Sequence, residues 1–294
     1  MSISNFTTEV RWNFFLNARI LMMVFSLHAT TLEVWAQKYR SSSNKAKGIE
    51  VNFGGSNMLG DLGGADGPGS NGLKDFDKEA IRSTFGASFI MKVSKSVSVK
   101  PNIQFTSLHG SDAYTLDVWR RERNITVNTN VISLATMVEL NVPISRTTAF
   151  GSGPSIFMST GLGAIFFNPK AIYNGASYNL HAIGTEGPQA YSRFALNIPL
   201  SAGFRYAIDR SNSIGVELQS NNAFTDYLDD VSHTYYDNDK ILTDQGEVGA
   251  QLADPNLSGR KHRAGDHRGN PREKDIYVLF TLHYRYTIPN GGLF

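Results

Sequence analysis

The chain has 294 residues and no cysteine, with 41% hydrophobic, 18% charged and 11% aromatic residues. The absence of cysteine excludes a disulfide scaffold, a thiolate zinc site and a thiol nucleophile. The 28 basic and 26 acidic residues balance to a net charge of +2, so the overall electrostatics predict no nucleic-acid partner. The mean hydropathy of -0.24 is too polar for a bundle of membrane helices but is compatible with membrane strands, whose alternating residues average out.

The first 36 residues have the pattern of an export signal. Arg11 and Arg19 precede the apolar run 20–27, which is much shorter than the roughly 20 residues of a spanning helix. A small-residue site ends at Ala36, where we expect cleavage; the alternative is a buried helix of a cytosolic protein. The predicted organisation is a signal peptide at 1–36, a periplasmic segment at 37–47, a barrel domain at 48–288 and a C-terminal tail at 289–294.

Eight later segments alternate apolar with small or polar residues, which is the pattern of a strand with two different faces. Each segment spans about 9 to 15 residues, enough to cross a bilayer at the tilt of a barrel strand. The segments are Ile49–Asn57, Thr84–Val93, Val97–Leu108, Val131–Val142, Ile156–Phe167, Phe194–Ile208, Ser213–Asn222 and Ile276–Ile288.

These segments predict an all-β fold, an eight-stranded antiparallel transmembrane β-barrel that is OmpA/OmpX-like in size, apolar outside and hydrophilic inside. The connections after odd-numbered strands are long and the others are short, which predicts short periplasmic turns, long extracellular loops and both termini in the periplasm. Aromatic residues near both strand ends support two interfacial belts. We therefore expect the protein in the outer membrane, in contact with its lipid. A soluble lipocalin-like barrel, with its apolar face turned inward, is the structural alternative.

Eight ionisable side chains fall on the inward face in this register, all in the periplasmic half of the barrel. A Lys or Arg facing lipid near mid-membrane would cost about 2–4 kcal/mol, which favours this register strongly. Because unpaired charge in a narrow lumen is costly, we expect a network of salt bridges that plugs the barrel; a proton or ion pathway is the alternative. The predicted network is Glu50, Lys92, Lys100, Glu139, Arg205, Glu217, His283 and Arg285.

The chain lacks the short motifs of zinc proteases, serine hydrolases and phosphate-binding loops. The glycine-rich stretch 54–64 leads into no predicted helix, so we interpret it as a strand end followed by a loop. We predict no cofactor, no metal and no enzymatic activity. A barrel acyltransferase or lipase is the minority alternative, and it would need Ser, His and an acid together at one rim.

Two charged stretches mark the longest connection. Asp226, Asp229, Asp230 and Asp237 lie among tyrosines; we interpret them as a solvated or self-packed loop, with calcium as an alternative. A basic tract at 260–274 is expected to remain solvated, or else to contact lipid phosphates.

Residues 54–63 read Gly-Gly-Ser-Asn-Met-Leu-Gly-Asp-Leu-Gly, and further motifs lie at 167–171, 184–187, 224–237 and 268–271. Together they resemble PorG-like outer-membrane proteins of the type IX secretion system, a family found in Bacteroidetes. The resemblance covers most of the chain from Ile49 to Tyr286, and its most specific part is 224–237. The motif residues singled out are Gly54, Gly55, Asp61, Gly184, Glu186, Phe224, Asp226, Tyr227, Asp229 and Asp230.

The resemblance implies a non-enzymatic barrel that anchors the periplasmic PorK–PorN ring to the outer membrane during protein export. Its implied partners are outer-membrane lipid and PorK/PorN-like ring proteins, with the periplasmic turns, above all 141–154, as the expected contact. A surface-binding or adhesin-like barrel that uses its long loops is the alternative function. The tail 289–294 departs from the family pattern, because such barrels often end at the last strand.

Overall fold

The computed structural model describes residues 46–62, 77–115, 117–145, 152–188 and 191–288. The predicted signal peptide, nearly all of the periplasmic N-terminal segment and the C-terminal tail lie outside the described residues and stay predictions. The strands all belong to the compact unit that begins at Lys47.

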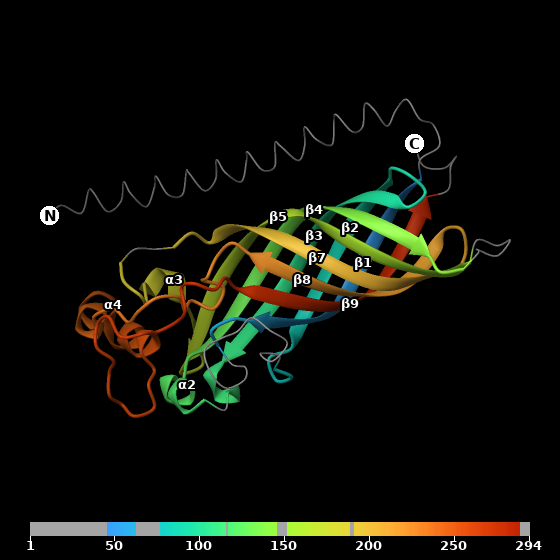
Figure 1. Ribbon diagram of the computed structural model, residues 1–294. Coiled ribbons are helices and arrows are strands. Elements are labelled where there is room, and N and C mark those ends of the chain that lie inside the picture. Colours follow the sequence, from blue (N-terminus) through green and yellow to red (C-terminus); the bar gives the residue numbers. More distant parts are fainter. Residues whose placement is uncertain (1–45, 63–76, 116, 146–151, 189–190, 289–294) are drawn as a thin grey trace, which may run out of the picture. The chain divides into compact units, whose positions relative to one another are not determined.

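Eight long antiparallel strands form a closed barrel (Figure 1). Their order around the sheet is β4-β3-β2-β1-β9-β8-β7-β5, and the pairing of β4 with β5 closes the ring. A short ninth strand, β6 (Ala176–Asn179), pairs with the end of β5 outside the ring. The barrel strands are β1 (Lys47–Leu59), β2 (Arg82–Lys92), β3 (Val97–Ser111), β4 (Thr126–Pro143), β5 (Gly153–Tyr173), β7 (Phe194–Ala207), β8 (Asn212–Ala223) and β9 (Ile276–Ile288).

All eight predicted strands are present, and the antiparallel barrel is confirmed. The main difference is length at one end of the barrel: β4 begins at Thr126 rather than Val131, and β5 continues to Tyr173. These extensions carry the sheet beyond its apolar band, where most outward residues, such as Thr126, Asn130 and Lys170, are polar and weaken the alternating hydrophobic signal. Val127 and Ala171 instead pack into a hydrophobic cluster formed with the loops.

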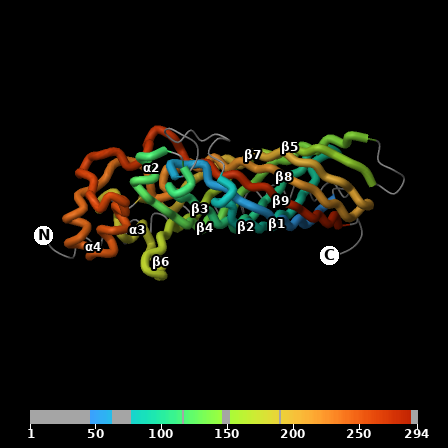
Figure 2. Tube along the Cα trace, turned by 90° about the horizontal axis from the view of Figure 1, so that it is seen from below, coloured from blue at the N-terminus to red at the C-terminus, as the bar shows by residue number. Residues whose placement is uncertain are grey.

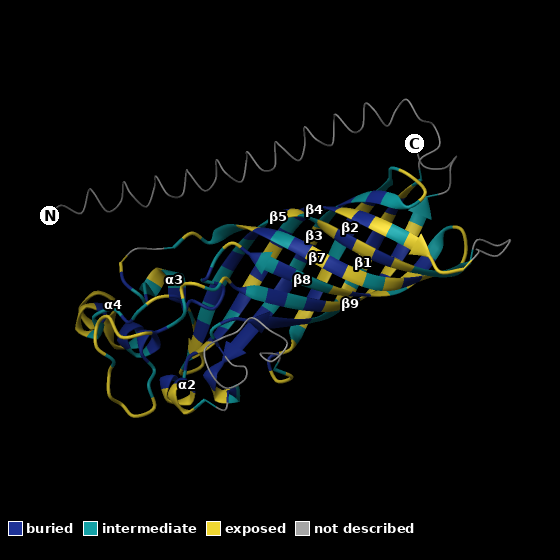
Figure 3. Cartoon of the chain, in the orientation of Figure 1, coloured by how far each residue is buried: buried dark blue, intermediate teal, exposed yellow. Residues whose placement is uncertain are grey.

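The barrel has a hydrophobic exterior, and Figure 3 shows the alternation as a checkerboard of exposed and buried residues. Its interior is charged and polar in the half with the short turns, and toward the loop end it holds a buried apolar cluster that includes Leu108, Phe167 and Leu279. On the outer face Phe53 is 64% exposed, Leu162 68% and Leu218 57%. Extended apolar surface of this kind is rare on soluble monomers and is the surface that a lipid bilayer covers. The soluble lipocalin-like alternative, which needs the apolar face inside, is therefore wrong.

The two ends of the barrel differ in their connections (Figure 2). At one end the turns 93–96 and 208–211 are short, and residues 144–152 join β4 to β5. The other end carries β6, the 3-10 turn η2 (Asp112–Tyr114), α2 (Val118–Arg123), α3 (Leu180–Ile183) and α4 (Asn238–Ala253). In outer-membrane barrels the short turns are periplasmic and the long loops extracellular. No helix in the described part of the chain has the length and apolar character needed to cross a membrane.

Strands β1 and β9 approach closely at Gly54. A Cβ atom at Gly54 would overlap the carbonyl oxygen of Phe280, whereas at Gly55 the nearest heavy atom would be Cγ2 of Ile81 at 3.2 Å. We expect Gly54→Ala to destabilise the barrel by about 1–3 kcal/mol, because β9 would have to move away from β1. The matched variant Gly55→Ala should cost much less. Urea unfolding read by heat-modifiable gel mobility measures both, and equal unfolding midpoints would contradict the expectation.

Candidate functional sites in the lumen and the loops

Seven ionisable side chains meet inside the periplasmic half of the barrel, and we call them the lumenal charge layer. They come from six of the eight barrel strands, and each is at most 6% exposed. Because neighbouring strands pair in register, Glu50 of β1 lies directly opposite Arg285 of β9. The layer consists of Glu50, Lys100, Glu139, Arg205, Glu217, His283 and Arg285.

Glu139 is the centre of the lumenal charge layer. Arg285 donates hydrogen bonds to its two carboxylate oxygens at 2.8 and 2.7 Å, and Arg205 donates two more at 2.9 and 3.0 Å. The Nε of Arg285 also donates to Glu50 at 2.7 Å. Bidentate arginine–carboxylate bonds are among the strongest and most directional polar contacts in proteins, so these contacts tie β1, β4, β7 and β9 together across the lumen.

The remaining members complete a balanced set of three carboxylates with two arginines and one lysine. Lys100 Nζ lies 3.3 Å from Glu50, 3.8 Å from Glu139 and 3.6 Å from Glu217. His283 lies 3.4 Å from Glu50 and 3.7 Å from Glu217. The barrel is only wide enough for side chains to fill it, so the layer obstructs the lumen.

Lys92, the eighth residue of the predicted network, is not among these seven side chains. It is the last residue of β2, it is half-buried, and it forms no ion pair with the described part of the chain. It lies on the inward face near the charges of Arg285, Arg205 and Glu139. The inward placement of Lys92 therefore stands, and its pairing within the network stays a prediction.

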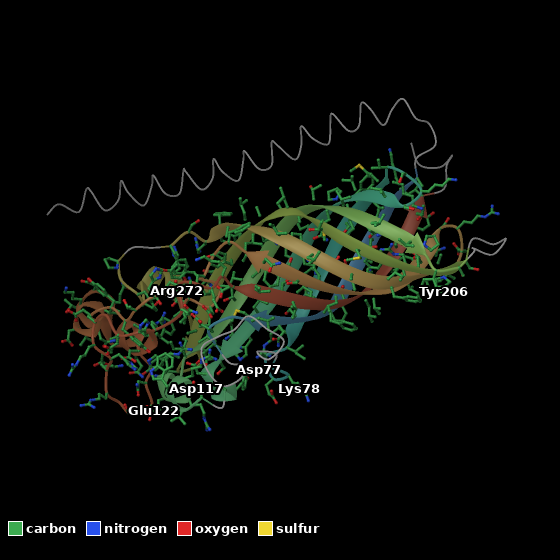
Figure 4. All side chains as sticks on the ribbon, in the orientation of Figure 1. Asp77, Lys78, Asp117, Glu122, Tyr206 and Arg272 are labelled. Carbon is green, nitrogen blue, oxygen red and sulfur yellow. The ribbon has the colours of Figure 1, made fainter. Side chains whose placement is uncertain are left out.

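The long connections fold into a unit at the extracellular end, which we call the loop cap (residues 60–62, 112–125, 174–193 and 224–275, as far as they are described). Figure 4 shows Asp117, Glu122 and Arg272 at this end and Tyr206 at the opposite one. The loop cap has a hydrophobic core that it shares with the barrel rim: Leu62, Ile125, Val127, Ala171, Leu180, Val231 and Leu252. The connections are thus folded against one another, not merely solvated.

Two buried arginines link the segments of the loop cap. Arg123 of α2 donates to both carboxylate oxygens of Asp112 at 2.8 and 2.7 Å, to the carbonyl oxygen of Asp61 at 2.8 Å and to the carbonyl oxygen of Arg268. Arg268 in turn donates to Glu186 at 3.1 Å and to a backbone carbonyl of the 224–237 motif. Arg268 belongs to the basic tract that was expected to be solvated, and it is instead fully buried.

Most motif residues meet in this network. Glu186 accepts hydrogen bonds from the backbone N–H groups of Ser232 at 2.8 Å and His233 at 3.1 Å. Asp230 accepts from the hydroxyls of Thr185 at 2.5 Å and Tyr191 at 2.6 Å.

Gly184 and Tyr227 also help to fold the loop cap. Gly184 ends α3 with φ +67°, a conformation that favours glycine, and so lets the chain turn back toward the 224–237 motif. Tyr227 stacks on Tyr191 with ring centroids 4.2 Å apart.

Three buried aspartates, Asp226, Asp229 and Asp275, lie close to the half-buried Asp61 in the loop cap. Burial raises the pKa of Asp226 to about 7. Burial, together with repulsion from the neighbouring carboxylates, raises the pKa values of Asp229 and Asp275 well above the usual value. No group of acidic and histidine side chains in the described residues has an arrangement that could hold a metal ion.

Four of the residues singled out take no part in this network. Gly54 and Gly55 lie in the wall of β1. Phe224 is 59% exposed at the outer rim of the barrel, where aromatic rings meet lipid headgroups. Asp237 caps α4 by accepting a hydrogen bond from the backbone N–H of Asp239 at 3.1 Å.

No protein-family profile and no curated protein sequence matches the chain. Solved structures that resemble it include Neisserial surface protein A, at 5% identity and a TM-score of 0.41, and Ail of Yersinia pestis, solved with the heparin analogue sucrose octasulfate, at 11% identity and a TM-score of 0.34. Each covers 83% of this chain and 99% of its own length.

The barrel's own geometry defines the class of protein. A closed barrel of eight strands, with an apolar exterior and with its buried charges paired inside, satisfies the backbone and the side chains in a bilayer. The protein is an integral outer-membrane β-barrel.

Proposed function

We propose that the protein is a non-enzymatic outer-membrane anchor for the periplasmic PorK/PorN-like ring of the type IX secretion system. One observation carries the proposal: the motifs that resemble PorG-like proteins lie in separate parts of the sequence, and most of their polar residues contact one another in the loop cap. Chance matches scattered along the chain would have no reason to meet in one folded unit.

The obstructed lumen supports a role in binding partner proteins rather than in passing cargo through the barrel. The lumenal charge layer crosses the barrel with paired side chains from opposite strands, so a polypeptide cargo has no path through it. The apolar exterior embeds the barrel in the membrane. The parts left to meet periplasmic partners are the turns and the chain ends at the periplasmic side.

Replacing residues 146–151 with a Gly-Ser hexapeptide is expected to lower recovery of the ring proteins at least tenfold, equivalent to about 1.4 kcal/mol of binding free energy. These residues lie outside the described part of the chain, within the longest periplasmic connection. The measurement is a pull-down on the purified full-length barrel. The control places a Gly-Ser hexapeptide within residues 63–76, on the extracellular side. Full recovery with the turn variant would refute the turn contact, and no recovery with the native barrel would refute the anchor.

A surface-binding barrel is the second candidate, favoured by the loop cap being a folded unit with its own core and a cavity. A deletion strain separates the two functions. Loss of secreted cargo with intact adhesion supports the anchor, whereas loss of adhesion with normal secretion supports surface binding.

A further inference from the structure

A cavity of about 800 Å³ opens in the loop cap between the end of β1, helix α2 and the segment that precedes β9. Its volume falls in the range of small-molecule sites, about 300–1,000 Å³. The side chains on which the inference depends are Asp61, Asp117, Trp119, Arg120, His267 and Arg272. The cavity is separate from the lumenal charge layer, which lies at the other end of the barrel.

The walls of the cavity are fixed before any ligand arrives. Asp117 caps α2 by accepting hydrogen bonds from the backbone N–H groups of Trp119 at 2.8 Å and Arg120 at 3.3 Å. Asp61 accepts from the backbone N–H of Asn270 at 2.6 Å, which joins β1 to the segment before β9. The bonds of Arg123 to Asp112 and to the backbone of Asp61 hold α2 against both. Preformed walls reduce the ordering entropy that binding would otherwise cost.

The exposed surface of the cavity combines the aromatic ring of Trp119 with the polar side chains of His267 and Arg272. The indole of Trp119 is 44% exposed, and the guanidinium of Arg123 lies 5.2 Å from its ring. His267 and Arg272 are exposed beside the cavity. A pyranose ring has the matching chemistry, with an apolar C–H face for the indole and hydroxyls for the polar groups.

The charges favour an acidic sugar over a neutral one. Arg272 is the exposed arginine of the cavity lining, whereas Arg120 is buried and Arg123 is buried and paired with Asp112. The carboxylates of Asp61 and Asp117 already accept hydrogen bonds from backbone N–H groups. A guanidinium pairs well with the planar oxygens of a carboxylate and with sulfate or phosphate. Arg272 is exposed, so its guanidinium can reach such a group without first leaving a buried site.

We propose that this cavity binds an acidic saccharide, with Trp119 stacking on a sugar ring and Arg272 pairing with its carboxylate, sulfate or phosphate. Host glycans and the sugars of the cell's own lipopolysaccharide share this chemistry. The proposal does not depend on the ring-anchoring role, and it gives the surface-binding role a defined site.

Tryptophan fluorescence tests the proposal directly, because Trp119 is the sole tryptophan after residue 36. Barrel purified from outer membranes is titrated with a chondroitin sulfate tetrasaccharide, with the oligosaccharide released from the cell's own lipopolysaccharide, and with maltotetraose. We expect a saturable change with at least one acidic probe, and binding of maltotetraose at least tenfold weaker. Which acidic probe binds identifies the source. Equal affinity for maltotetraose, or no binding of either acidic probe at about 5 mM, would overturn the proposal.

Variants locate the binding in the cavity. Arg272→Ala is expected to weaken binding about tenfold, the loss of roughly one charge-assisted contact. Arg263→Ala removes an exposed arginine of the same basic tract that does not line the cavity, and it should bind like the native barrel. Trp119→Ala, followed by calorimetry, should abolish binding while heat-modifiable mobility shows an intact barrel. An equal loss in Arg263→Ala and Arg272→Ala would overturn the proposal, whatever the ring pull-down shows.

Discussion

Glu139→Gln is expected to lower the free energy of unfolding of the barrel by about 3–5 kcal/mol, the usual effect of breaking a buried ion pair from one side. Glu139 is fully buried and accepts four hydrogen bonds from Arg205 and Arg285. Glutamine has nearly the same shape, so packing is preserved. The loss arises because two arginines and Lys100 would then face only two carboxylates, and the excess positive charge would stay buried.

Urea unfolding in phospholipid vesicles, read by heat-modifiable gel mobility, measures this effect. Glu122→Gln serves as the control, because Glu122 is exposed on α2 and its replacement should change the free energy by no more than about 0.5 kcal/mol. The double variant Glu139→Gln/Lys100→Met should recover part of the loss, since two carboxylates would again face two arginines. A single variant as stable as the native barrel would show that the lumenal charge layer does not hold the strands together.

The barrel could be predicted from the sequence because one physical rule governs each strand. Lipid outside and a narrow polar lumen inside impose an alternation of period two, which the sequence shows directly. The same alternation placed Glu139, Arg205 and Arg285 inside, and opposite charges in a closed lumen have to pair. The rule fails where the membrane ends: at the start of β4 the outward residues, such as Thr126, are polar, and the polarity of a residue no longer indicates which face it lies on.

The loop cap could not be assembled from the sequence, because its contacts have no periodicity. Asp112 and Arg123 pair across one short connection. Asp61, in contrast, accepts a hydrogen bond from the backbone of Asn270, which lies near the other end of the sequence of the barrel domain. Arg268 stands in a tract of exposed cations, and composition alone gives no reason to bury it. The family resemblance marked several of the residues, but which groups they contact depends on the fold of the whole cap.

The loop cap is expected to loosen as the pH rises from about 4 to about 7. Burial raises the pKa of Asp226 to about 7, and burial with carboxylate repulsion raises the pKa values of Asp229 and Asp275 well above normal. In an opened cap these groups would face water and titrate near a pKa of about 3.9. Between the two pKa values the closed cap holds protons that the open cap has released, so rising pH favours opening. The stability that these acids contribute is complete below about pH 4 and is lost as the pH passes their closed-state pKa values.

Hydrogen–deuterium exchange of cap peptides between pH 5 and pH 8, corrected for the intrinsic exchange rate, measures this opening. Each proton released should raise the opening constant by up to about tenfold per pH unit within its window. Asp226→Asn keeps the hydrogen-bonding shape without a titrating group, so its opening should depend less on pH, whereas Asp244→Asn, on the exposed face of α4, should behave like the native barrel. An opening constant that falls as the pH rises would mean that the ion pairs of Arg123 and Arg268, and not the buried aspartates, dominate the titration of the cap.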